Sequence, residues 1–182
     1  LPAKNRNYDY PGMSLSAIIS DIFPQIKKAE VLNYMKFRTS LASTARLNTP
    51  YSTQSVFVNN FASGGGFSYG FTNANPDLRP EQQSTYEIGL ETKLFKNKLG
   101  LDVTYYNTNN KGQIIENFRI SYGTGFVLNT QNAASTRNEG VEISADWTVK
   151  NTKEFGWNIR FNFNRMWNRV TDMPRNVSEY YI

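Results

Sequence analysis

The segment VEISADWTVKNTKEFGWNIRFNFN, residues 141–164, alternates between apolar and polar residues on both sides of a short polar turn. Alternation with a period of two indicates an antiparallel hairpin that has one apolar face and one polar face. Residues 35–42, 86–93 and 99–106 alternate in the same way, and residues 13–23 do so more weakly. The sequence therefore predicts an all-β meander with strands over approximately residues 13–23, 35–46, 84–94, 98–107, 139–150 and 155–170.

The joins between these strands alternate in length. Residues 95–98 and 150–154 form short polar turns, whereas residues 47–80 and 108–137 form long loops rich in Asn, Gly, Thr and Ser. In transmembrane barrels of the outer membrane, the periplasmic turns are short and the extracellular loops are long. The join over residues 24–33 is of intermediate length and has room for one helical turn.

Strands of about 10 to 13 residues suit a tilted bilayer crossing better than the usual strand of about 5 to 6 residues. The sequence therefore predicts a transmembrane antiparallel up-and-down β-barrel segment of about six strands. Its apolar register would face outer-membrane lipid, and its two long joins would be extracellular. A soluble β-sandwich binding module, in which the apolar register forms the core, is the alternative.

The two short turns predict the pairing within each hairpin. Tyr86 would lie opposite Tyr105 in the first hairpin, and Val141 opposite Phe163 in the second, which keeps one face of each hairpin uncharged. Aromatic residues then stand at both ends of an aliphatic band, as in the interfacial girdles of membrane barrels. The predicted aromatic girdle consists of Tyr86, Tyr105, Trp147, Trp157 and Phe163.

The polar register would line a wet lumen if the apolar register meets lipid. The lumen-facing candidates are Lys36, Arg38, Glu87, Glu91, Asp102, Glu142, Asp146 and Arg160. Each is expected to pair with another side chain more readily than with a ligand. Side chains of the long loops could stack on sugar or peptide ligands, or pack within the loops, and these candidates are Tyr69, Phe71, Asn73, Tyr122 and Phe126.

Composition excludes most catalytic designs. The 182 residues include no Cys and no His, and the formal net charge is +5. Cysteine and imidazole chemistry are therefore absent, and no apolar run approaches the 18 or more residues of a helical membrane span. Glu87 and Glu91 would lie about 13 Å apart along one strand, too far for a glycosidase pair.

Two other patterns also lack the features of a known site. The glycines at residues 64–66 are not followed by the Gly-Lys-Ser/Thr of a phosphate-binding loop. The Lys and Arg residues are scattered and form no stripe that would follow a nucleic acid. We therefore predict no catalytic residue, no cofactor, no metal, no enzymatic activity and no nucleic-acid partner.

A resemblance to a known family begins in the long loop. Asn75-Pro76-Asp77-Leu78-Arg79-Pro80-Glu81, followed by Tyr86-Glu87-Ile88-Gly89, resembles the NP-x-L-[KR]-PE and [WY]-E-x-G stretch in the barrels of TonB-dependent outer-membrane receptors. Asn138-Glu139-Gly140-Val141-Glu142 resembles an element of the SusC/RagA branch of that family. The two prolines restrict the chain where the long loop re-enters the barrel wall.

This resemblance implies a 22-stranded barrel in the bacterial outer membrane, occluded by an N-terminal plug that TonB pulls through an N-terminal box. It also implies a SusD-like lipoprotein lid and the import of glycans or peptides as nutrients. We expect the plug and the TonB box to lie outside these residues, which form an internal section of a longer barrel domain. A barrel that serves as a structural subunit of a larger envelope complex is the alternative function.

Overall fold

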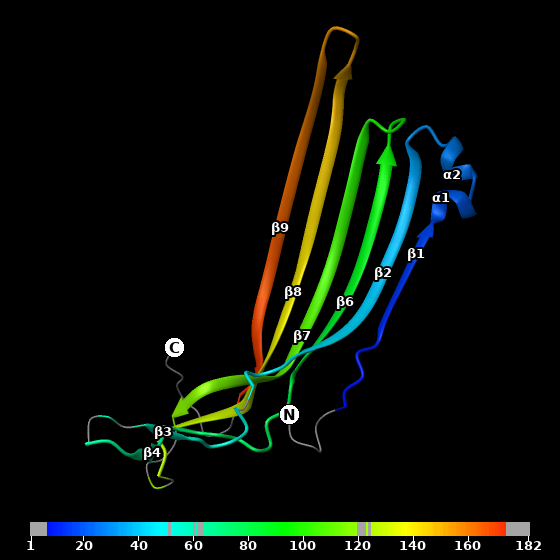
Figure 1. Ribbon diagram of the computed structural model, residues 1–182. Helices are drawn as coiled ribbons and strands as arrows, with labels where there is room; N and C mark the ends of the chain where they lie inside the picture. The colour runs from blue at the N-terminus through cyan, green and yellow to red at the C-terminus, as the bar shows by residue number, and fades with distance from the viewer. Residues whose placement is uncertain are drawn as a thin grey trace.

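One antiparallel sheet of long strands dominates the structure (Figure 1). The computed structural model describes residues 7–50, 52–59, 61, 64–119, 123 and 125–173. Each long strand pairs with the next long strand along the chain, which confirms the predicted all-β, up-and-down fold. In spatial order the long strands are β1 (Gly12–Ile18), β2 (Leu32–Arg46), β6 (Glu81–Leu94), β7 (Leu99–Arg119), β8 (Leu128–Asn151) and β9 (Gly156–Asp172).

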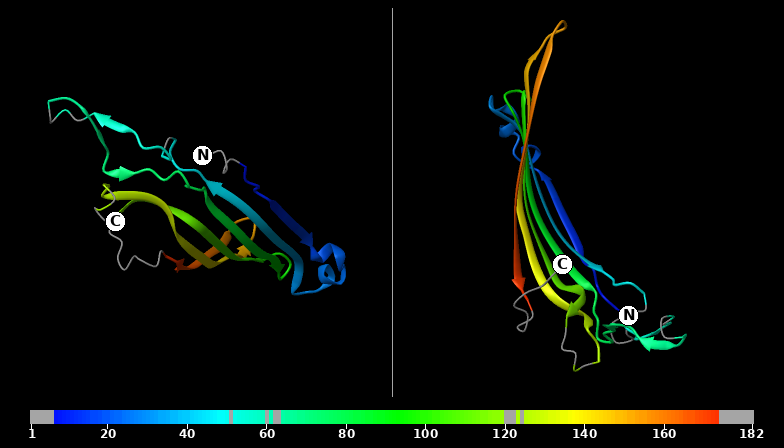
Figure 2. Two further views of the ribbon diagram at one scale, coloured as in Figure 1. Left: turned by 90° about the horizontal axis from the view of Figure 1, so that it is seen from below. Right: turned by 90° about the vertical axis from the view of Figure 1, so that its left-hand side faces the viewer.

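The shorter elements lie in the joins. Two helical turns, α1 (Ile19–Ile22) and α2 (Gln25–Lys28), connect β1 to β2. The long loop before β6 contains β3 (Phe57–Asn59) and β4 (Phe67–Tyr69), which pair with each other, and β5 (Thr72–Asn73), which runs parallel to the start of β8. Figure 1 shows the short turns at one end of the sheet and β3 and β4 at the other. Figure 2 shows that the sheet is curved and twisted.

The described residues form no hydrophobic core on either face of the sheet. Among the described residues, Leu78, which is 2% exposed, is the only buried hydrophobic residue. A β-sandwich requires a second sheet packed on the apolar face. The only other sheet in the described part of the chain is the β3–β4 pair, whose strands have three residues each. The sandwich alternative is therefore wrong for this part of the chain. No helix described here is both long enough and apolar enough to cross a membrane.

The first predicted strand, over residues 13–23, is wrong in its second half. β1 ends at Ile18, and α1 begins at Ile19. Two adjacent apolar residues, Ile18 and Ile19, interrupt the period of two, and Pro24 has no backbone N–H to donate to a strand ladder. The predicted helical turn in the join over residues 24–33 is confirmed by α2.

The predicted long loop over residues 108–137 is mostly strand. β7 continues to Arg119 and β8 begins at Leu128, so the two strands form a long hairpin whose end bends away from the rest of the sheet (Figure 1). The register shifts after Asn110, and Gly112 has a φ of 62°. Positive φ and shifted pairing are features of β-bulges, which bend a strand. Asn and Thr residues predicted a loop here, but they can also pair across strands, as Asn110 Nδ2 does with Thr136 Oγ1 at 3.3 Å.

Both predicted hairpin registers are wrong by two residues. Tyr105 lies opposite Ile88, and Phe163 lies opposite Ile143. In the first hairpin, residues 95–98 form a four-residue turn between Leu94 and Leu99. The first three turn residues, Phe95, Lys96 and Asn97, have φ between 53° and 64°. Because a shift of two residues returns every side chain to the same face, the predicted sorting of polar and apolar side chains is unaffected.

Candidate functional site

The polar register of the long strands forms one continuous polar face of the sheet. Lys36, Glu91, Asp102 and Ser144 follow one another in a single row across β2, β6, β7 and β8. By the same alternation, all eight side chains that the sequence singled out as lumen candidates lie on this face. Glu91 and Asp102 lie directly opposite each other on β6 and β7.

A bidentate ion pair crosses this face from β2 to β7. Arg38 Nη1 donates to Asp102 Oδ2 at 2.8 Å, and Arg38 Nη2 donates to Asp102 Oδ1 at 2.6 Å. Nη2 also donates to Thr104 Oγ1 at 2.7 Å. Two parallel N–H···O bonds hold a guanidinium in one orientation. The pair therefore fixes β2 relative to β7 across the intervening strand β6.

Glycine in β6 makes this crossing possible. Gly89 lies opposite Arg38 on β2 and opposite Thr104 on β7. A Cβ on Gly89 would lie 2.7 Å from Arg38 Cγ, closer than carbon atoms approach without displacement. Gly140 has the same role in β8, where a Cβ would lie 2.6 Å from Tyr106 Oη. Both glycines belong to the motifs that resemble the known family. In each case the close approach of a neighbouring side chain explains why a residue without a Cβ stands there.

The substitution Gly89→Ala tests this role of glycine. The new Cβ would displace Arg38 and break its two bonds to Asp102, so we expect the free energy of unfolding to fall by about 1–3 kcal/mol. Urea unfolding of the full-length protein in detergent measures the change. In an Arg38→Ala background the same glycine substitution should cost much less, because the obstructed side chain is gone.

Gly100→Ala is the matched control for that experiment. A Cβ on Gly100 would meet Asp146 O at 3.9 Å, an ordinary van der Waals distance. We expect this variant to stay within about 0.5 kcal/mol of the wild type. Equal losses for Gly89→Ala and Gly100→Ala would contradict a specific role for Gly89.

Other polar candidates pair along the β8–β9 hairpin. Arg160 Nε donates to Asp146 Oδ1 at 2.5 Å, and Asn164 Nδ2 donates to Glu142 Oε1 at 3.3 Å. Arg160 and Asp146 are largely exposed, so this pair adds little to stability. These contacts show cross-strand pairing of the polar register, as expected for side chains that share a wet surface.

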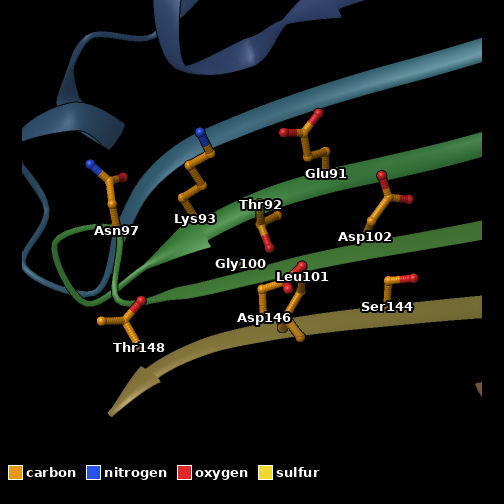
Figure 3. Close-up of a pocket in the computed structure, with 10 residues that line it drawn as sticks. All are labelled: Glu91, Thr92, Lys93, Asn97, Gly100, Leu101, Asp102, Ser144, Asp146 and Thr148. Carbon is orange, nitrogen blue, oxygen red and sulfur yellow. The ribbon is translucent and has the colours of Figure 1, made fainter. Parts of the chain in front are cut away.

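A polar hollow of about 370 Å³ lies at the short-turn end of this face (Figure 3). Glu91 of β6, Asp102 of β7 and Asp146 of β8 contribute carboxylates to its lining. Glu91 forms no hydrogen bond or ion pair with any other described residue, in contrast to Asp102 and Asp146. Lys93, also in the lining, lies over the Tyr34 ring at 5.2 Å from the ring centroid.

The chemistry available in this hollow is hydrogen bonding and charge pairing. No group of three or more carboxylates in the described part of the chain is arranged so that it could hold a metal ion. Glu91 faces Asp102 across the two strands, and both carboxylate oxygens of Asp102 already accept hydrogen bonds from Arg38. The hollow can therefore bind water, a polar solute or a polar polypeptide segment.

The aromatic candidates in the loops divide into two groups. The Tyr69 ring packs against Phe57 at 4.7 Å between centroids and against Phe126 at 6.0 Å. Tyr69 and Phe126 therefore join two loops to each other, the second of the two roles that the sequence left open. Phe71 is 78% exposed. Tyr122 lies outside the described residues.

Phe71 and Asn73 line a second hollow, of about 480 Å³, between the loops. Most of its other lining residues carry amide or hydroxyl groups, and Glu116 is its one charged residue among those described. An exposed aromatic ring next to neutral hydrogen-bonding groups suits a polar, uncharged ligand surface. The candidates Phe71 and Asn73 thus share one hollow, and Tyr69 does not line it.

The segment from Asn75 to Glu81 is anchored by a residue that the sequence did not single out. The side chain of Asn132 on β8 accepts from Arg79 N at 2.8 Å and donates to Arg79 O at 2.8 Å. The same side chain donates to Gly112 O at 2.7 Å. Asn132 thereby ties the end of the long loop to the bulge of β7. Nothing in the local sequence pattern distinguishes it from the other Asn residues of this hairpin.

Four of the five predicted girdle residues lie toward the two ends of the apolar face. Trp147 and Trp157 lie at the short-turn end, whereas Tyr86 and Tyr105 lie toward the loop end. Phe163 lies opposite Ile143, nearer the middle of the band. Trp167, on the same register of β9, lies in the row of Tyr86 and was missed. Its spacing of ten residues from Trp157 is the signal that could have identified it.

The comparisons with known proteins agree with this geometry. The chain matches the family model described as TonB dependent receptor-like, beta-barrel, over residues 23–179. TonB-dependent receptor P3 of Formosa agariphila is 27% identical over 154 residues, which are 82% of this chain and 15% of that protein. TonB-dependent receptor SusC of Bacteroides thetaiotaomicron is 28% identical over 112 residues, which are 59% of this chain and 11% of that protein.

A solved structure gives the same result. The RagAB peptide importer in its closed-closed state matches with a TM-score of 0.85 and 25% sequence identity. The match covers 100% of this chain and 20% of the chain in that structure. The chain therefore spans a small part of the length of each protein that it resembles.

Proposed function

Because this chain belongs to the TonB-dependent receptor-like β-barrel family, we propose that it forms part of the wall of an outer-membrane barrel that imports a nutrient. The observation that carries the proposal is the apolar face, which no other segment of the described part of the chain covers. Val103 and Trp147 lie on the interior strands β7 and β8, yet they are 38% and 50% exposed. A continuous apolar surface of this kind is unfavourable in water and favourable against lipid.

The height of the apolar band supports a membrane crossing. Trp157 and Trp167 lie ten residues apart on the same face of β9, or about 33 Å along the strand. With the tilt of about 40° that is usual in membrane barrels, this span corresponds to about 25 Å along the bilayer normal, the usual height of the apolar band. The two Trp side chains would then lie in the two interfacial girdles.

The polar face is the proposed lumen surface. A curved sheet brings side chains together on its concave side and spreads them on its convex side. Polar side chains that are far apart in the sequence, such as Arg38 and Asp102, form hydrogen bonds with each other on this face. On the opposite face, large apolar side chains are exposed. We therefore assign the polar face to the lumen and the loop end, with its neutral hollow, to the cell exterior. Phe71 and Asn73 are the proposed ligand contacts.

Cargo and partners follow from the relatives. The resemblance to the SusC/RagA branch implies a glycan or a peptide, and one similar solved structure is a peptide importer, so a glycan or a peptide is the proposed cargo. A SusD-like surface lipoprotein would close the barrel from outside, and TonB would act through an N-terminal region outside these residues. Transport by this route involves no enzymatic step. The alternative, a structural barrel in a larger envelope complex, predicts the same wall without cargo uptake.

Uptake by living cells separates these two functions. Cells that carry or lack the gene for the full-length protein receive fluorescent oligosaccharides and oligopeptides, with and without a protonophore. An importer predicts that uptake of one class is lost on deletion and also on collapse of the proton gradient, because TonB is energised by that gradient. Unchanged uptake in the deletion strain, with disassembly of an envelope complex, would support the structural alternative.

A further inference from the structure

Three arginines gather on the apolar face of the β8–β9 hairpin, at its loop end. They are Arg137 on β8 and Arg165 and Arg169 on β9, and we call them the arginine cluster. Arg165 lies opposite Val141, and Arg137 lies directly opposite Arg169. The register between these strands is regular from residue 136 to residue 148, so all three side chains share the face of Trp147 and Phe163.

Such a pairing is unfavourable unless another group compensates for it. Side chains directly opposite each other have Cβ atoms about 5 Å apart, and like charges there are destabilising. Arg137 Nη2 pairs with Glu139 Oε2 at 3.0 Å. The same oxygen also accepts from Tyr105 Oη at 3.3 Å and from Asn107 Nδ2 at 3.2 Å. Glu139 lies opposite Trp167, between Arg165 and the Arg137–Arg169 pair, and its one carboxylate is already shared by three donors.

The remaining positive charge has no carboxylate partner in the described part of the chain. Arg165 and Arg169 are exposed and form no ion pair there. Asp172, the next acidic residue along β9, lies opposite Ser135 and forms no ion pair with the cluster. The guanidinium of Arg165 instead lies over the Trp167 ring, 5.0 Å from its centroid. That contact leaves its N–H groups available to an outside anion.

The position of the cluster identifies the anion. Trp167 is the proposed outer girdle residue, so Arg165 lies just inside the membrane boundary and Arg169 just outside it. Long Arg side chains reach toward the headgroups from such positions. Arg also forms paired bonds to phosphate oxygens. We propose that the arginine cluster binds the phosphate of an anionic lipid headgroup in the outer leaflet. This inference rests on the proposed placement of the chain in the outer membrane.

Native mass spectrometry of the full-length protein in detergent tests the site. The probe is phosphatidic acid, which has a phosphate monoester headgroup, and diacylglycerol provides the same acyl chains without phosphate. We expect the wild type to prefer phosphatidic acid and the double variant Arg165→Gln/Arg169→Gln to bind it about tenfold more weakly. Both lost cations are on the apolar face, so the polar face keeps its ion pairs.

The matched control removes two cations elsewhere. Lys28 lies in α2 and Lys153 in the turn between β8 and β9, both outside the long strands. We expect Lys28→Gln/Lys153→Gln to keep the wild-type affinity for phosphatidic acid. Inorganic phosphate at matched ionic strength should not displace the lipid, because it lacks the acyl chains that lie against the apolar band.

Three results would overturn the inference: equal binding of phosphatidic acid by the Arg variant and the wild type, an equal loss in the control variant, or displacement by inorganic phosphate. Recovery of the wild-type protein in the outer-membrane fraction tests the placement separately. A protein that resides in that membrane and binds both lipids equally contradicts the lipid site alone.

Discussion

Replacement of Ile143 by Arg should lower the free energy of unfolding by about 2–4 kcal/mol, because it places a charge near the middle of the lipid-facing band. Ile143 lies between Val103 and Phe163, about halfway between the two proposed girdle levels. A charged side chain at this depth cannot reach either interface without distorting the wall. The measurement is the urea midpoint of the full-length protein refolded into lipid vesicles, together with its abundance in the outer membrane.

Ser144→Arg is the control, since it introduces the same side chain one residue later on the same strand. Ser144 lines the polar hollow near Glu91, Asp102 and Asp146, where an added cation meets water and carboxylates. We expect a change within about 1 kcal/mol. Equal damage at both positions would show that the strand tolerates no Arg on either face. An unaffected Ile143→Arg protein would show that the apolar face does not lie in lipid.

Asn132→Leu should release the end of the long loop from the wall. The substitution removes three hydrogen bonds, two to Arg79 and one to Gly112, and leaves the backbone groups of those residues without their partner. At about 1 kcal/mol for each bond, we expect a loss of about 3 kcal/mol. Hydrogen exchange of the full-length protein should show faster exchange in residues 75–81, because Arg79, the residue that Asn132 holds, lies in this segment.

Two further variants sharpen the test at Asn132. Asn132→Asp keeps the acceptor for Arg79 N and loses both donors, so we expect an intermediate effect. Gln131→Leu changes the preceding side chain, which forms no hydrogen bond within the described residues, and should leave exchange in residues 75–81 unchanged. If Gln131→Leu and Asn132→Leu accelerate exchange equally, the anchor is not specific to Asn132.

The sequence singled out residues 75–81 as the segment where the long loop re-enters the wall, but it did not show what holds this segment in place. Asn75 Oδ1 accepts from Asp77 N at 2.9 Å, and Leu78 N donates to Asn75 O at 3.3 Å, so the segment forms a local turn before β6 begins at Glu81. This much follows from Asn-Pro and Arg-Pro chemistry. The clamp by Asn132 joins residues 53 positions apart, and no local pattern encodes such a distance.

The length of the β7–β8 hairpin is a second feature that the sequence did not predict. Asn, Thr and Gly are common in loops, and their density over residues 108–137 predicted one. Pairing between the two strands supplies each backbone group with a partner and overrides the weak local preference. The bulge at Gly112 then turns the hairpin so that its end approaches the long loop, where Phe71 O accepts from Val127 N and Leu128 N.

Alternation along each strand was sufficient to predict the all-β fold, the up-and-down order and the polar and apolar faces of the strand segments that it identified correctly. The reason is that a period of two survives any even error in register, and both hairpins were wrong by two. The tertiary structure was needed to establish which side chains lie opposite or reach one another across strands. Arg38 reaches Asp102 because Gly89 leaves room for its side chain, and Arg137 lies opposite Arg169 because the turn sets the register of that hairpin. Those contacts depend on the absolute register and on loop geometry, which a repeating pattern does not contain.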